Sequence, residues 1–198
     1  MTGEAKQAKA FVERKITRMA EGPSETAARA TLAKLRRGVG KAPGGMPELW
    51  GITLDGLPEA LSGKTDAPSR GEWAVHTALT LFALHQQGKD LKKQCMSKDG
   101  EPFGAAVRRL ITNDDDEKRV KRRFDAAATS GSLEEFSHHL RGLVQLLKTQ
   151  NLPMDYPALA EDLYWFQIPD ARDSVRLRWG RDFYGARKKE ENENQIEQ

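Results

Sequence analysis

The chain has 198 residues, a formal net charge of +3 and a single cysteine, Cys95. Its length allows one large or two small hydrophobic cores, whereas the lone cysteine excludes an intrachain disulfide and a zinc site built from cysteines. The charge is too small to indicate nucleic acid by its total, so the positions of the basic residues have to decide.

The first two elements are predicted helices. Apolar residues recur at helical spacing over residues 8–19, and a second helix begins after Ser24, a good N-cap, and ends at Gly38. Charged residues interrupt the first fifteen positions, which predicts the absence of a signal peptide. We therefore expect a cytoplasmic protein.

Residues 41–71 are rich in glycine and proline, which predicts loops with short helices near 47–54 and 58–61. A helix over 70–87 follows, with apolar residues around nearly its whole circumference. Its apolar stretch is too short and too interrupted to span a bilayer, so we expect no membrane insertion. We place it instead at the centre of an N-terminal helical domain.

The sequence of the second half predicts another helical bundle, which follows a polar linker over residues 88–101. Ser132 with Glu135 at the third following position makes a capping box. No segment alternates with a period of two, so we predict an all-α fold of two small helical-bundle domains, 1–95 and 96–184, with a disordered tail over 185–198. Helices are expected over 102–112, 114–129 and 133–150, then from Asp155, and from Pro169 to about Gly185.

The most suggestive chemistry lies in the predicted helix over 114–129. Val120 and Phe124 mark its apolar side, and its acidic residues, 114–117, occupy the first turn, where the helix dipole favours them. Two interpretations stay open here: a solvated face neutralised by these acids, or a surface that binds phosphate groups. The basic residues opposite the apolar side are Lys118, Arg119, Lys121, Arg122 and Arg123.

Aromatic side chains are a second means of holding a nucleic-acid strand, because bases stack on them. All four tryptophans lie among apolar neighbours in the sequence, which favours core packing. We therefore expect contacts with the phosphate backbone rather than base stacking. The tryptophans are Trp50, Trp73, Trp165 and Trp179.

No catalytic site, metal site or cofactor is expected. His138 and His139 are adjacent and project about 100° apart on a helix, so they do not share a metal ion. The consecutive aspartates 114–116 point in different directions, and helix capping explains them. The sequence contains neither a GxxxxGK[ST] nor a GxGxxG phosphate loop. We predict a protein that is not an enzyme.

Residues 132–184 carry an ordered set of short motifs: His139-Leu140-Arg141, Asp155-Tyr156, Asp162-Leu163, Val175-Arg176, Trp179-Gly180 and Asp182-Phe183-Tyr184. In order and spacing they resemble the CasB family, the small subunit of the type I-E CRISPR surveillance complex called Cascade. A weaker match over 30–38 extends the resemblance to the first half of the chain.

The resemblance implies a non-catalytic, all-helical subunit that holds the displaced non-target DNA strand in a basic groove, stabilises the RNA–DNA hybrid loop and braces the assembly. The implied partners are the other Cascade subunits, the CRISPR RNA, the target DNA and a second copy of the chain. By position, the candidates for strand contact are Arg36, Arg37, Arg119, Lys121, Arg122, Arg123 and Arg141.

Two other classes of protein stay open. A helix-turn-helix regulator is also small, helical and basic, but it needs a recognition helix that aims polar groups at base edges. A pure scaffold contacts only other proteins, and it differs from a strand-binding subunit by giving no crosslink to the displaced strand.

Overall fold

The computed structural model describes residues 3–22 and 24–196, with side chains described up to Gly185. Within these ranges the chain forms nine α-helices and a short 3-10 helix, without a strand. Ser97 and Met154 form an isolated bridge between two loops. The all-α prediction is confirmed.

The first half begins with two helices that pack on a central third. Ser24 caps the second helix of the chain, since its Oγ accepts a hydrogen bond from the Ala27 N–H at 3.1 Å. Of the 16 residues of the helix from Arg70 to His85, 12 are buried, which confirms its central place. The elements are α1 Gly3–Ala20, α2 Glu25–Arg37, α3 Pro47–Thr53, the 3-10 helix Glu59–Leu61 and α4 Arg70–His85.

The second half contributes α5 Phe103–Arg108, α6 Asp114–Ala128, α7 Leu133–Thr149, α8 Tyr156–Phe166 and α9 Pro169–Ile196. Ser132 caps α7, but the Glu135 carboxylate accepts from the Gly131 N–H at 2.7 Å, so the predicted capping box is only half formed. Helix α9 continues beyond Gly185, where we expected it to end. The side chains of the predicted disordered tail lie outside the described residues.

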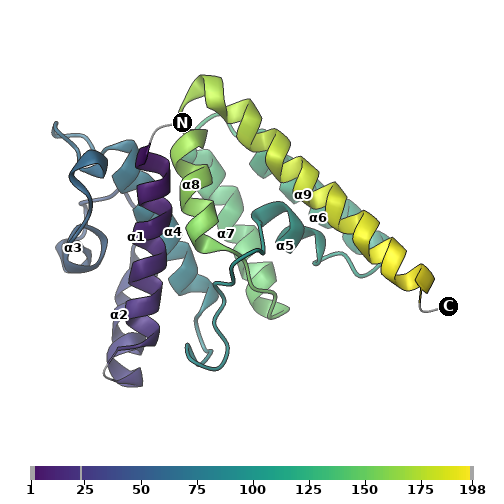
Figure 1. Ribbon diagram of the computed structural model, residues 1–198, viewed down its shortest axis with the longest axis horizontal. Coiled ribbons are helices and arrows are strands. Elements are labelled where there is room, and N and C mark those ends of the chain that lie inside the picture. The colour runs from purple at the N-terminus through teal and green to yellow at the C-terminus, as the bar shows by residue number, and fades with distance from the viewer. Residues whose placement is uncertain (1–2, 23, 197–198) are drawn as a thin grey trace.

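Helices from both halves share one hydrophobic core. In Figure 1, α1, α4, α7 and α8 run side by side, while α9 lies along the right-hand side with α5 and α6. Helix α8 belongs to the second half of the sequence, yet it packs against both α1 and α4. The division into domains at 95 and 96 stays a prediction.

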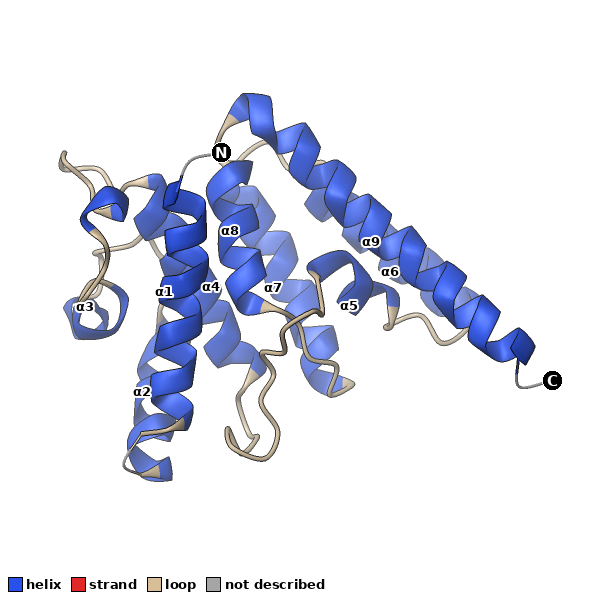
Figure 2. Cartoon of the chain, in the orientation of Figure 1, coloured by secondary structure: helices blue, strands red, loops and turns tan. Residues whose placement is uncertain are grey.

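The predicted linker is a loop, as Figure 2 shows between α4 and α5. It is fastened to the segment before α8 by three backbone hydrogen bonds. Met154 N–H donates to Met96 C=O at 3.1 Å, and Asp155 N–H donates to Glu101 C=O at 2.7 Å. Lys98 N–H donates to Met154 C=O at 3.2 Å. These hydrogen bonds fix the path of the loop beside the N-terminal end of α8.

An aromatic cluster holds α9 against α5, α7 and α8. The fully buried Trp179 stacks on Phe136, with ring centroids 4.7 Å apart, and on Phe166, at 5.6 Å. Its Nε1–H donates to the Asp162 carboxylate at 2.6 Å. A Cβ at Gly104 would stand 2.1 Å from the Trp179 carbonyl oxygen, so only glycine permits this approach of α5 to α9. The motif residues Asp162 and Trp179 thus build the core.

Candidate nucleic-acid interface

The α6 basic face is the outer side of α6. Val120 and Phe124 are buried against the core, so the helical period turns the basic residues outward. Phe124 stacks on Phe183 of α9, with ring centroids 4.6 Å apart, which fixes the rotation of α6. The face consists of Lys118, Arg119, Lys121, Arg122 and Arg123.

Acidic neighbours on the same helix neutralise part of this face. Arg119 forms an ion pair with Asp116, and Lys121 pairs with Asp125 at 2.8 Å. The Asp125 carboxylate raises the pKa of Lys121 above its ordinary value. Within the described part of the chain, Arg122 and Arg123 have no ion-pair partner. They are the two arginines of this face whose charge is open to a ligand.

A second set of cations comes from several elements, and we call it the α2–α7 basic surface. Arg36 and Lys89 both lie close to Lys148 of α7. The Lys89 ammonium donates to the Lys148 carbonyl oxygen at 3.2 Å, and that of Lys148 donates to Gln87 Oε1 at 2.9 Å. Arg29 lines the same groove as Arg36 and Lys89. The surface consists of Arg29, Arg36, Lys41, Lys89, Arg141 and Lys148.

The gathered charges perturb one another. Partial burial lowers the pKa of Lys148, and the nearby charges of Lys89 and Arg36 lower it further. Among the described residues, Glu25 forms a direct ion pair with this surface, through Arg29 one helical turn away. Like charges held this close repel one another in the free protein, so a bound anion relieves that repulsion.

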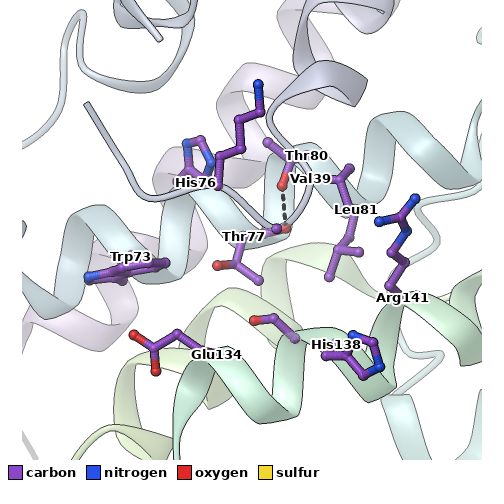
Figure 3. Close-up of a pocket in the computed structure, with 12 residues that line it drawn as sticks. Val39, Trp73, His76, Thr77, Thr80, Leu81, Glu134, His138 and Arg141 are labelled. Atoms are coloured by element: carbon purple, nitrogen blue, oxygen red, sulfur yellow. Dashed lines mark hydrogen bonds between the residues drawn. The ribbon is translucent and has the colours of Figure 1, made fainter. Parts of the chain in front are cut away.

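The α2–α7 basic surface continues along α7 to a cavity. Arg141 precedes Lys148 by two helical turns, about 10 Å along the axis. Arg141 and Lys41 both line a cavity of about 350 Å³ between α4, α7 and the turn after α2 (Figure 3). Two of the residues that line this cavity, His76 and Ser137, each have a buried polar atom, Nδ1 and Oγ, without a hydrogen-bond partner among the described residues.

The structure separates the predicted contact residues into two groups. Arg36 and Arg141 belong to the α2–α7 basic surface, while the four from α6 form their own face. Figure 1 places α2 and α6 at opposite sides of the core. Arg37, the remaining candidate, is exposed and pairs with Glu48 of α3 at 3.1 Å.

Three cations of the α2–α7 basic surface were missed by sequence reasoning. Arg29, Lys89 and Lys148 stand singly in the sequence and come together only through packing. One signal was present: Arg141 and Lys148 are seven residues apart and therefore share a face of α7.

Several other arginines have structural roles. Arg172 and Arg176 of α9 donate to the carbonyl oxygens of Gly131 at 2.6 Å and Ser130 at 2.7 Å, and both guanidinium groups lie over the Phe166 ring. They hold the turn between α6 and α7 against α9. Because these groups are committed to the fold, they are poor candidates for strand contact.

The histidines offer no metal site. His85 Nδ1 lies 2.9 Å from the Tyr156 hydroxyl in the core between α4 and α8, and burial lowers the pKa of His85 to about 4. In the described ranges, no group of three or more histidine, cysteine, aspartate or glutamate side chains is placed to hold a metal ion. None of the helices in those ranges is long and apolar enough to cross a membrane.

The tryptophans divide in a way that their sequence neighbours did not indicate. Trp179 is fully buried, and Trp73 and Trp165 are partly buried against the core. Trp50 is 46% exposed, and its Nε1–H donates to the Gly44 carbonyl oxygen at 3.1 Å. The expectation of core packing is therefore wrong for Trp50, which fastens α3 to the loop before it.

Comparisons with known proteins agree with this architecture. The family model of the CRISPR-associated protein Cse2 matches residues 31–184. The crystal structure of CasB from Thermobifida fusca is 34% identical, with a TM-score of 0.73, over 89% of this chain and 97% of that one. The CasB structure from Thermus thermophilus is 22% identical, with a TM-score of 0.67, over 90% and 97% of the two chains.

A chain of a structure titled "CRISPR RNA-guided surveillance complex" is 20% identical, with a TM-score of 0.70, over 96% of this chain and 99% of that one. At this identity the similarity concerns the fold. Comparison with curated protein sequences finds no significant match.

Proposed function

The chain belongs to the Cse2, or CasB, family of CRISPR-associated proteins, and we propose that it is a non-catalytic subunit of an RNA-guided DNA surveillance complex. In this role it holds the displaced non-target strand on its basic surfaces and stabilises the hybrid loop. Its partners are the other protein subunits, the CRISPR RNA, the target DNA and a second copy of itself, in the cytoplasm. The structural similarity to a chain of a surveillance complex supports assembly with such partners.

The observation that carries the proposal is the α2–α7 basic surface. Lysine and arginine side chains from several elements gather there, and partial burial, together with the nearby charges of Lys89 and Arg36, lowers the pKa of Lys148. A single strand supplies a row of phosphates that neutralises such a surface without requiring a particular base sequence. The α6 basic face, through Arg122 and Arg123, supplies further phosphate contacts.

Modest contacts are enough for this role. Exchange between a DNA duplex and an RNA–DNA hybrid is nearly balanced in free energy, so protein contacts with the displaced strand shift the equilibrium toward the open loop. These contacts make loop stability sensitive to salt and tolerant of sequence. Cleavage chemistry is not required of this subunit.

The test is charge reversal in the assembled complex. We expect Arg36→Glu with Lys148→Glu to weaken binding of target duplex by about tenfold or more, and to reduce photocrosslinks between this subunit and the displaced strand. Lys6→Glu with Lys64→Glu is the matched control, because both lysines are exposed and lie outside the two basic surfaces.

Circular dichroism and co-purification with the other subunits establish that each variant folds and assembles. Unchanged DNA binding at physiological salt would remove the α2–α7 basic surface from the strand path. The absence of any crosslink from the wild-type subunit would identify a scaffold that contacts only protein.

A further inference from the structure

The cavity between α4, α7 and the turn after α2 has chemically different ends. Figure 3 shows Trp73 and Glu134 at one end, and Arg141 beside His138 at the other. Lys41 also lines it. A cavity of about 350 Å³ is within the range of sites that bind small organic groups.

His76 sets a hydrogen-bonding requirement for any ligand of this cavity. Its side chain is almost completely buried, at 3% exposed, and its Nε2 lies 3.1 Å from the Gly38 carbonyl oxygen. Because a carbonyl oxygen only accepts, Nε2 carries the ring proton opposite Gly38. The Lys41 backbone also interacts with the ring, while Nδ1 itself has no hydrogen-bond partner among the described residues. Burial lowers the pKa of His76, which keeps the ring neutral near pH 7.

Ser137 adds a second unsatisfied group from the facing helix. Its Oγ is buried and has no described partner, and a hydroxyl both donates and accepts. A buried polar atom without a partner is destabilising, so both atoms favour a ligand that reaches them. The ligand must therefore present an N–H or O–H donor to His76 and a polar group to Ser137.

A phosphodiester alone does not meet these requirements, because it has no N–H or O–H donor for His76 Nδ1, although Lys41 and Arg141 attract it. An apolar group satisfies neither His76 nor Ser137. A nucleotide meets all of them, because its base has a ring or exocyclic N–H donor, carbonyl or ring-nitrogen acceptors and a flat face for an aromatic neighbour, while its phosphate is anionic.

We propose that this cavity takes one nucleobase turned out of the displaced single strand, with the adjoining phosphate between Lys41 and Arg141. The base donates to His76 Nδ1, contacts Ser137 and lies against Trp73. The inference rests on the proposed strand-holding function and adds a base contact to it, where the sequence favoured backbone contacts alone. Arg141 connects the cavity to the α2–α7 basic surface that carries the rest of the strand.

The test compares the full-length protein's binding to two labelled single strands of equal length. One is ordinary DNA, and the other carries abasic sites throughout, so the phosphates match and the bases differ. We expect the ordinary strand to bind about tenfold tighter, from the stacking of a single base. Ser137→Phe fills the cavity and should reduce binding of the ordinary strand to the level of the abasic one.

Thr17→Phe is the matched control, since Thr17 is an exposed hydroxyl residue on α1, away from the cavity. It should retain the preference for the ordinary strand. Equal binding of both strands by the wild type would overturn the base pocket and leave the strand-holding function standing. Failure to bind either strand would overturn both. A preference that persists in folded Ser137→Phe would place the base contact elsewhere.

A second measurement needs no variant. Imidazole 15N resonances of the full-length protein are followed during titration with each of the four deoxynucleoside monophosphates and, separately, with dimethyl phosphate, a phosphodiester without an O–H donor. We expect at least one nucleotide to shift His76 Nδ1, because an acceptor nitrogen responds when it gains a donor, and dimethyl phosphate to leave it unchanged. A shift with dimethyl phosphate as large as with every nucleotide, or no shift with any nucleotide, would overturn the proposal.

Discussion

The α6 basic face and the α2–α7 basic surface differ in how they are made. On α6, the cations follow one another in the sequence, and acids one turn away pair with Arg119 and Lys121. On the α2–α7 basic surface, the cations come from separate elements, and burial together with the charges of Lys89 and Arg36 lowers the pKa of Lys148. A run of charge in a sequence is thus partly neutralised by its own neighbours, whereas cations that stand singly in the sequence gather only through folding.

The largest expected effect is on the stability of the hydrophobic core, which carries both basic regions. Trp179→Ala should lower the free energy of unfolding by about 3–5 kcal/mol, because it empties the centre of the aromatic cluster and leaves the Asp162 carboxylate without the indole donor. Urea unfolding monitored by circular dichroism measures this. Trp50→Ala, at a half-exposed tryptophan, is the control and should cost far less. Similar losses in the two variants would contradict the central role of the cluster.

Lowering the pH should destabilise the packing around α4 before it affects the ion pairs of α6. The folded-state pKa of His85 is about 4, whereas that of an unfolded histidine is about 6.5. Between these values the unfolded chain binds a proton that the folded chain excludes, so the free energy of unfolding falls as pH drops from 6.5 toward 4. At pH 5 the expected loss from His85 is about 2 kcal/mol.

Urea unfolding at pH 7 and pH 5 checks this loss, with His85→Gln as the comparison. That variant should be less stable at pH 7, since it disturbs the contact with Tyr156, but it should show a smaller decline on acidification. An equal decline in both proteins would assign the acid sensitivity to other groups, such as His76, whose pKa burial also lowers.

The next largest effect is expected from charge reversal of the two arginines of α6 that have no ion-pair partner among the described residues. Arg122→Glu with Arg123→Glu should weaken target binding by the assembled complex severalfold and lower the salt dependence by about two phosphate contacts. The helical fold should remain, because both side chains are exposed. Electrophoretic binding assays over a range of salt concentrations measure both quantities. An unchanged salt slope would confine the strand to the α2–α7 basic surface.

The smallest effect is expected where α6 already neutralises itself. Arg119→Gln with Lys121→Gln removes two cations that have acidic partners, so the net loss of attraction for phosphate is small. Binding should change by less than about threefold in the same assay. A loss as large as that of the Arg122 and Arg123 reversal would show that the ion pairs open on binding, and it would remove the contrast between the two regions.

Local chemistry explains what the sequence predicted well. Ser24 and Asp155 cap their helices through contacts three residues away, and such contacts depend on little beyond the neighbouring sequence. The outward turn of the α6 cations follows in the same way from the helical positions of Val120 and Phe124. The capped helix starts and the direction of side chains were therefore within reach, whereas the ends of α5, predicted at 112, and of α9, predicted near Gly185, were not.

Long-range packing explains what was missed. The apolar positions Leu159 and Leu163 indicate that α8 is buried, but they do not tell that its partners are α1 and α4. For the same reason, neither the sequence around Arg36 nor the sequence around Lys148 indicates that the two side chains lie close together, because their helices are far apart in the chain. Trp50 was misjudged because apolar sequence neighbours do not ensure burial in a short helix.

The packing of α8 on α1 also sets an order of events during synthesis. The hydroxyl of Tyr164 binds the Glu4 carboxylate across a separation of 160 residues, and the buried face of α1 lies against α8. At ribosomal rates of about 5–20 residues per second, α1 waits roughly 8–30 s before its partner is made. During that interval the buried apolar face of α1 lacks the contribution of α8 to its covering, so part of an apolar stripe stays exposed on the nascent chain.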